Sequence, residues 1–151
     1  MKKFKFTLQP VLEHRKRIED EKRIVVAARQ RAVDEAEREL ARLNSEFHKH
    51  TLALSTEHVR YETRELQSAY AHLAFLDRCI VAQIRIVAER RVALDRARNE
   101  LLAASREKKV VEKLKERRRE AFVLEEQRIE QNELDDANAR RYSRAQLGGM
   151  L

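Results

Sequence analysis

The distribution of glycine and proline limits the possible folds of this chain more than any other feature. Both glycines stand at positions 148 and 149, and the one proline is Pro10. Tight turns and hairpin loops depend largely on these two residue types, so a long interior without them is poorly suited to many short elements. Ala, Leu, Glu, Lys, Arg and Gln dominate that interior, and these side chains lose little rotamer freedom in a helix. We therefore predict an all-α chain of long helices.

Two apolar stripes mark the faces that these helices must bury. The second half carries a heptad repeat of Leu66, Leu73, Ile80, Val87, Leu94 and Leu101, with Tyr70, Leu76, Ile84, Ala97 and Ala104 in the alternate slots. This spacing is typical of a coiled-coil seam. The first half has a looser stripe of Ile18, Val25, Ala28, Ala32, Ala36, Leu40, Leu43, Phe47 and Leu54. With 39% charged and 5% aromatic residues, little is left for a thicker core.

The stretch between the stripes predicts a reversal of the chain. Residues 54–65 break the apolar phase and contain the helix N-cap candidates Ser55, Thr56 and Thr63. Folding back covers both stripes within one chain, and loop closure costs little more as the loop lengthens. We predict one long antiparallel two-helix coiled-coil hairpin over residues 1–151 with frayed termini: helix 1 about 9–54, turn about 55–63, helix 2 about 64–140 and flexible tail 141–151. One continuous helix is the alternative.

The predicted turn also sets which residues of the two arms meet. A turn centred near residue 58 places Lys16 to Glu19 opposite residues 97–100, and Phe4 to Pro10 opposite residues 106–112. The lead "FTLQPVL" is expected to be extended, with Pro10 in the first helical turn where its missing donor is not needed. Phe4, Phe6 and Leu8 alternate and are expected to staple the open end. Beyond Leu114 the heptad weakens, so residues 115–140 are expected to project as an unpaired helix.

No pattern in the chain predicts a catalytic, cofactor or metal site. A phosphate-cradling loop needs glycines, and none precedes residue 148. His48 and His50 are two residues apart, which points them to different helix faces, whereas helical metal ligands usually stand four apart. Cys79 lies beside the seam and is expected to pack as a small hydrophobe. No run of about 18 apolar residues or secretory core is found, so we expect a cytoplasmic protein.

The basic run near residue 113 has three possible roles. Residues 106–119 carry eight Lys or Arg and three Glu, a net charge of +5, within a chain of net charge +7. The run can grip a phosphate backbone, form a solvated helix face or dock on a protein. Glutamates interrupt it, it follows the heptads rather than preceding them, and no aromatic platform accompanies it. Protein docking is therefore the favoured interpretation, and no nucleic-acid partner is expected.

A second candidate surface lies near the predicted tip. Aromatic and large aliphatic side chains gather there on more than one helix face: Tyr61, Tyr70, His72, Leu73, Phe75, Leu76 and Ile80. Phe75 and Leu76 are adjacent, so they cannot both point into the seam. The patch is either a partner site or a cover over the flank of the seam, because scattered exposed apolar residues are normal.

The stretches "FKFTLQPVLEHRKRIEDEKR" and "ASREKKVVEKLKERRREAF" together resemble the flagellar type III export protein family FliJ. The resemblance extends over nearly the whole chain, through the Ala-rich first helix and the heptad second helix. It implies a non-enzymatic coiled-coil hairpin, similar to the stalk of rotary ATPases, that works in bacterial flagellum biogenesis, protein export and motility. It further implies a cytoplasmic position, peripheral to the inner face of the membrane at the flagellar base.

The resemblance also implies partners for the two ends of the hairpin. The open end would dock on the flagellar export ATPase ring and promote its assembly, through Phe4, Phe6, Leu8, Val11, Lys113, Lys115, Arg117, Arg118 and Arg119. The tip-proximal second helix would dock on the membrane export-gate protein, through His72, Leu76, Cys79 and Gln83. Export substrate chaperones are further expected partners, and no cofactor is implied. The alternatives are a nucleic-acid-binding coiled coil and a purely structural one that dimerises along its seams.

Overall fold

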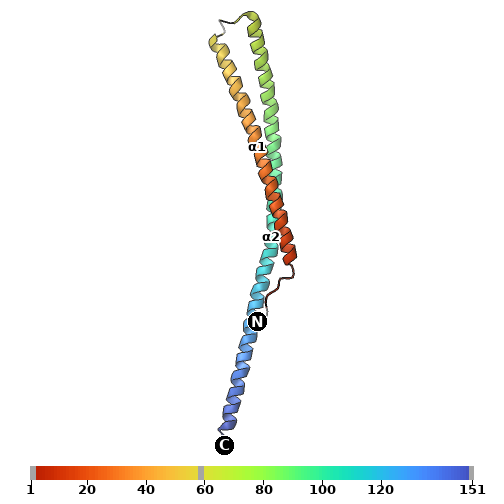
Figure 1. The fold of residues 1–151 in the computed structure, drawn as a ribbon, viewed down its shortest axis with the longest axis vertical. Coiled ribbons are helices and arrows are strands. Elements are labelled where there is room, and N and C mark those ends of the chain that lie inside the picture. The colour runs from red at the N-terminus through yellow and green to blue at the C-terminus, as the bar shows by residue number, and fades with distance from the viewer. Residues whose placement is uncertain (1–2, 58–59, 150–151) are drawn as a thin grey trace. The chain divides into compact units, whose positions relative to one another are not determined.

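The computed structural model describes residues 3–57 and 60–149, and these form a helical hairpin (Figure 1). Helix α1 spans Gln9–Glu57 and helix α2 spans Thr63–Gly148, with no strand in the described residues. The predicted all-α two-helix hairpin is confirmed. The chain divides into two compact units, a hairpin unit of residues 18–105 and a terminal unit of residues 1–17 and 106–151.

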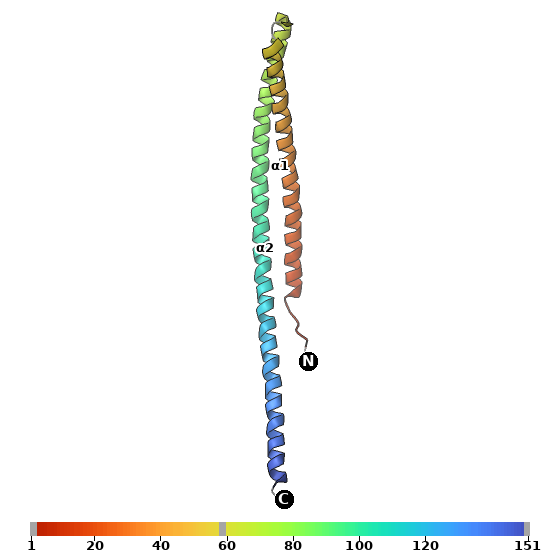
Figure 2. The ribbon, with the colours of Figure 1, turned by 90° about the vertical axis from the view of Figure 1, so that its left-hand side faces the viewer.

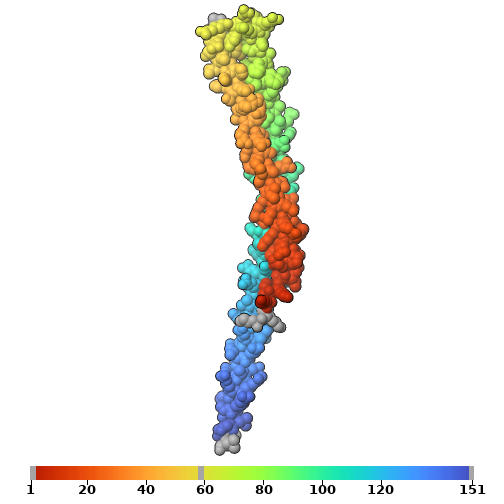
Figure 3. Space-filling view, in the orientation of Figure 1, coloured from red at the N-terminus to blue at the C-terminus, as the bar shows by residue number. Residues whose placement is uncertain are grey.

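In the hairpin unit, α1 and α2 run antiparallel and side by side (Figures 1 and 2). The buried apolar side chains of α1 are Val33, Ala36, Leu43 and Leu54. Those of α2 are Leu76, Val87, Leu94, Ala97 and Ala104. Their spacings of three, seven and eleven residues are sums of the three- and four-residue steps between coiled-coil core positions, and small alanines let the helices approach closely. The space-filling view shows the side chains of the two helices in contact along this unit (Figure 3).

The seam differs from the predicted one at four positions. Tyr70 and Ile84 are exposed, at 62% and 53%, because each alternate slot of the seam follows its heptad residue by three residues rather than four. The polar Gln83 therefore occupies the slot predicted for Ile84. On α1, Val25 and Ala28 are exposed, and the interface follows a strict heptad that was not recognised. Its buried or half-buried members in this unit are Glu19, Val26, Val33, Leu40, Phe47 and Leu54, and Ala36 and Leu43 are buried in the alternate slots.

The two helices meet the connecting segment at residues other than those predicted. Helix α1 continues to Glu57, three residues beyond 54. Of the predicted turn, His58 and Val59 lie outside the described residues. Helix α2 begins with Glu62 as its N-cap, since the Leu66 amide donates to the Glu62 carbonyl at 3.0 Å and the Glu62 amide donates to Glu65 Oε2 at 3.1 Å. This backbone-to-side-chain bond is half of a capping box.

In the terminal unit, a non-helical lead of residues 3–8 joins α1. The stretch predicted to be extended is instead a turn at residues 7–8, where the Gln9 amide donates to the Phe6 carbonyl at 3.1 Å, followed by helix from Gln9. The Leu12 amide donates to the Leu8 carbonyl at 3.0 Å, so Pro10 stands where no backbone donor is needed. Phe6 and Leu12 are buried. The Phe4 ring lies 5.7 Å from that of Phe122, in agreement with the predicted stapling of the open end.

The register of the two arms differs from the predicted one in both units. In the hairpin unit Glu19 bonds Ser105, and in the terminal unit Thr7 bonds Arg118; both α2 residues lie further along the chain than predicted. One reason is that the segment between the helices runs from residue 58 to 62, so its centre falls beyond residue 58.

Helix α2 continues past the residues that pack against the lead. From residue 127 to 149 every described side chain is exposed. The helix ends at Gly148, whereas the prediction placed the start of a flexible tail at residue 141. The helix continues because no residue between Asn132 and Leu147 is a strong helix breaker. Residues 150 and 151 of that tail lie outside the described residues. No described helix has a stretch long and apolar enough to cross a membrane.

Candidate functional site

Two cations of the basic run, Lys115 and the exposed Arg118, hold the lead. Lys115 Nζ donates to Gln9 Oε1 at 2.9 Å, and Arg118 Nη1 donates to Thr7 Oγ1 at 3.2 Å. Both cations also lie over the Phe6 ring, at 6.0 and 5.9 Å from its centroid. Lys115 and Arg118 are three residues apart and share one face of α2, so together they clamp the lead onto the helix.

The other three predicted cations, Lys113, Arg117 and Arg119, are exposed. Lys113 and Arg119 line an open groove of about 460 Å³ in the terminal unit. Its lining is Leu12, Lys16, Lys109, Glu112, Lys113, Lys115, Glu116 and Arg119. Five of these side chains are cationic and two are anionic, and Leu12 supplies an apolar floor. The groove therefore suits an acidic surface that also presents an apolar side chain.

The predicted apolar residues of the lead have different surroundings. Phe6 is buried at 9% exposure, and Phe4 and Leu8 are half-buried. Val11 is 41% exposed and lies in the first turn of α1. Phe4, Phe6 and Leu8 thus serve first to attach the lead, and Val11 is the apolar residue of this set most available to a partner.

Near the tip, two of the four predicted residues belong to the seam. Leu76 is 3% exposed, and Gln83 Nε2 donates to the Ala36 carbonyl of α1 at 2.9 Å. His72 is exposed and Cys79 is half-buried. The four residues are separated by four, three and four residues, which is the spacing of coiled-coil core positions. Because Leu76 and Gln83 face α1, the four do not form one exposed face.

An aromatic cluster surrounds His72. Its ring lies 4.8 Å from that of His50 on α1, in an edge-to-face arrangement, and 6.4 Å from that of Phe75, which is stacked and 53% exposed. Leu76 points inward and Phe75 outward, as their adjacency predicts. His50 was not recognised as a neighbour of His72, because the two are brought together only by the pairing of the helices.

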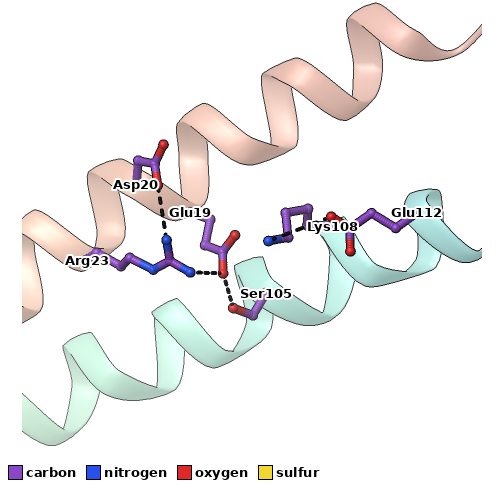
Figure 4. Close-up of polar contacts among 6 residues, drawn as sticks. All are labelled: Glu19, Asp20, Arg23, Ser105, Lys108 and Glu112. Carbon is purple, nitrogen blue, oxygen red and sulfur yellow. Dashed lines mark hydrogen bonds and ion pairs between the residues drawn. The ribbon is translucent and has the colours of Figure 1, made fainter.

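A buried carboxylate is the polar feature that the sequence interpretation missed (Figure 4). Glu19 is 4% exposed, and its Oε1 accepts from Arg23 Nη2 at 2.9 Å and from Ser105 Oγ of α2 at 2.6 Å. Arg23 also pairs with Asp20 at 3.3 Å. The strict heptad of α1 is the signal that places Glu19 in the interface. Figure 4 also draws the ion pair of Lys108 and Glu112 in the terminal unit, at 3.8 Å.

No cluster of three or more metal-ligating side chains occurs among the described residues. On the surface of α1, hydrogen bonds from Arg42, at 2.6 and 2.9 Å, hold the pKa of the Glu39 carboxyl below its ordinary value. The same contact raises the pKa of Arg42. Both side chains are solvent-accessible on α1, at 44% for Glu39 and 54% for Arg42, so the pair is an ordinary surface ion pair.

A model of the family described as flagellar FliJ protein matches residues 4–147 of the chain. This chain belongs to the FliJ family. The helical hairpin of this FliJ family member is similar to the solved structure of CT670 from Chlamydia trachomatis, assigned as a YscO homolog. The two are 20% identical with a TM-score of 0.51, over 93% of this chain and 96% of CT670. At this identity the likeness shows the fold alone. No curated protein sequence matches the chain.

The family assignment defines the general role of the molecule. The FliJ family is a non-catalytic component of flagellar type III export, so this FliJ family member is an export component that interacts with the export apparatus.

Proposed function

We propose that this export component docks through its terminal unit on the flagellar export ATPase ring and promotes ring assembly. The observation that supports this role is that Lys115 and Arg118 hold the lead in a part of the basic run where Lys113, Arg117 and Arg119 are exposed, as Arg118 is too. Lys113 and Arg119 line the groove, and Arg117 and Val11 lie in the same unit outside the groove lining. A surface that is already ordered loses less entropy on binding.

The chemistry of this surface suits a repeated, modest contact. Exposed cations steer an acidic partner and set its orientation, while Val11, 41% exposed in the first turn of α1, offers an apolar side chain to the contact. A ring offers several similar surfaces to one asymmetric hairpin, so contacts that are individually weak let the ring change state around it. The hairpin needs no nucleotide site, because it acts by contacting some states of the ATPase better than others.

We further propose that the tip-proximal part of α2 contacts the membrane export-gate protein. The exposed His72 and Phe75, with the half-buried Cys79 beside them, offer aromatic and small apolar groups to a partner. Leu76 and Gln83 would act indirectly, by fixing the helix pairing that presents the other side chains. Export substrate chaperones are additional candidate partners. Through the gate protein, the molecule would lie peripherally at the inner face of the membrane at the flagellar base.

Hydrolysis of ATP by the export ATPase, with and without this protein, tests the docking role. Ring formation is measured in the same samples. Stimulated hydrolysis together with more ring is the expected result, and it should be lost when Lys113, Arg117 and Arg119 are each changed to Glu. The matched control changes Arg140, Arg141 and Arg144 to Glu, which are exposed cations of α2 away from the groove. Equal activity of both triple variants would exclude the basic run from docking.

A further inference from the structure

Helix α2 carries a second, largely apolar face, opposite the seam of the hairpin unit. Its residues are Val81, Ala88, Val92 and Ala103, with the polar Asn99 between the last two; all five are exposed, and in chain order they are separated by seven, four, seven and four residues. This spacing keeps them on one side of a helix with about 3.6 residues per turn. Val81 is 57% and Val92 is 61% exposed. They point away from the core residues Val87 and Leu94, so α1 does not cover this face.

Two shallow grooves meet on this face. They have volumes of about 560 and 410 Å³, and Val92 and Arg96 line both of them. Ile84 and Leu102, 53% and 49% exposed, lie along one edge of the same face. Isolated exposed apolar residues are normal, but a stripe at helical spacing with grooves along it is characteristic of a surface that receives a helix.

The charges along the other edge have a symmetric order. Arg85 is followed four residues later by Glu89, and Arg96 is followed four residues later by Glu100. When two such helices lie antiparallel about a two-fold axis near Val92, Arg85 of each helix faces Glu100 of the other, and Glu89 faces Arg96. The same superposition brings Ile84 opposite Leu102. A two-fold interface must be complementary to itself in this way, since the same surface lies on both sides.

We propose that a second copy of this chain is the partner of this face, so that two hairpin units pack through antiparallel α2 helices into a four-helix bundle. The self-complementary charges select a second copy over an unrelated helix, because an unrelated helix would have to carry the same order of charges by chance. Glu100 also pairs with Lys22 of its own chain through Oε2 at 3.0 Å, and a carboxylate accepts several hydrogen bonds. The proposal does not depend on the docking surfaces of the terminal unit or the tip.

Sedimentation equilibrium of the full-length protein tests the proposal. The chain has a mass of 17.9 kDa, and we expect the mass to rise to twice that value over a concentration series. Val92→Glu places two carboxylates next to each other at the axis, and should weaken dimerisation at least tenfold. The matched control is Ile24→Glu on α1, where the same kind of change is made at a side chain that is 68% exposed. It should leave the dimer unchanged.

A charge exchange distinguishes this geometry from non-specific association. Glu89→Arg opposes two arginines across the axis and should weaken the dimer, as should Arg96→Glu. The double variant restores opposite charges and should recover the dimer. A chain whose mass stays at 17.9 kDa up to about 0.5 mM would overturn the proposal, because a specific dimer is expected to have a dissociation constant well below that concentration. A dimer that Val92→Glu leaves intact, or that the double exchange fails to recover, would overturn it as well.

Discussion

Gln83 of α2 donates its side-chain amide to the backbone carbonyl of Ala36 in α1, at 2.9 Å. This bond joins the two helices at a seam slot that leucine or alanine would otherwise fill. The amide is half-buried, so the bond fixes the pairing of the helices at this level, where an apolar side chain would tolerate sliding.

Removal of this hydrogen bond should destabilise the hairpin. We expect Gln83→Ala to lower the free energy of unfolding in urea by about 1 kcal/mol, the usual net value of one hydrogen bond, with an added loss from packing. Gln67→Ala is the matched control, because Gln67 is exposed on the same helix. Equal unfolding midpoints of the two variants would show that the Gln83 bond does not contribute to stability.

The buried carboxylate of Glu19 should be more sensitive to substitution than its exposed neighbour. Glu19→Gln keeps the size of the side chain but removes the charge that faces Arg23 and Ser105. We expect a loss of about 1 to 3 kcal/mol in the free energy of unfolding, because a charged partner of a hydrogen bond is replaced in a buried site. Asp20→Asn, one residue away and exposed, should change it by less than about 0.5 kcal/mol. An unchanged free energy of unfolding in the Glu19→Gln variant would mean that the charge of Glu19 does not contribute to stability.

Phe6 should control whether the lead stays on α2. Phe6→Ala removes the buried ring that Lys115 and Arg118 cover, which is about 2 kcal/mol of burial. We expect faster amide hydrogen exchange in the first turn of α1, including Leu12, and unchanged exchange in the hairpin unit. Lys5→Ala, at an exposed position of the lead, is the control. Slow exchange retained in the Phe6 variant would show that other contacts hold the lead.

The pair of Glu39 and Arg42 predicts a specific pH response. Arg42 lowers the pKa of the Glu39 carboxyl, so the contribution of this pair to stability is present above the ordinary pKa and is lost as the pH falls through the lowered value. Arg42→Gln should raise the pKa of Glu39 toward its ordinary value, as measured by NMR titration of the carboxyl carbon. Arg31→Gln, two helical turns or more away, should leave it unchanged. Identical titrations in both variants would rule out the contact with Arg42 as the cause.

Sequence patterns located much of the α2 seam but misassigned part of both helices. Val87, Leu94 and Ala97 are buried as the heptad predicts, because their spacing alone defines a face. Ile84 was assigned to the seam because it is apolar, and the structure places Gln83 there instead. The second apolar face explains the error: α2 has apolar residues on two sides, so local hydrophobicity does not decide which side meets α1.

The candidate surfaces were predictable to different degrees. The basic run is visible in the sequence. Which of its cations contact the lead, as Lys115 and Arg118 do, depends on where the lead lies on α2. The contact of His50 with His72 likewise joins residues from different helices. Sequence spacing along one helix carries no information about such pairs until the register between the helices is known.

The sequence by itself determined that the described chain is helical and that it turns back once, because its interior lacks helix breakers and carries two stripes that need cover. Only the tertiary structure decided the register, the seam slot of Gln83 and the burial of Glu19. The physical reason is that helix propensity and heptad spacing are properties of short segments. The register between the two helices instead depends on where each helix ends, on the path of the non-helical lead and on which of the two apolar faces of α2 packs better against α1.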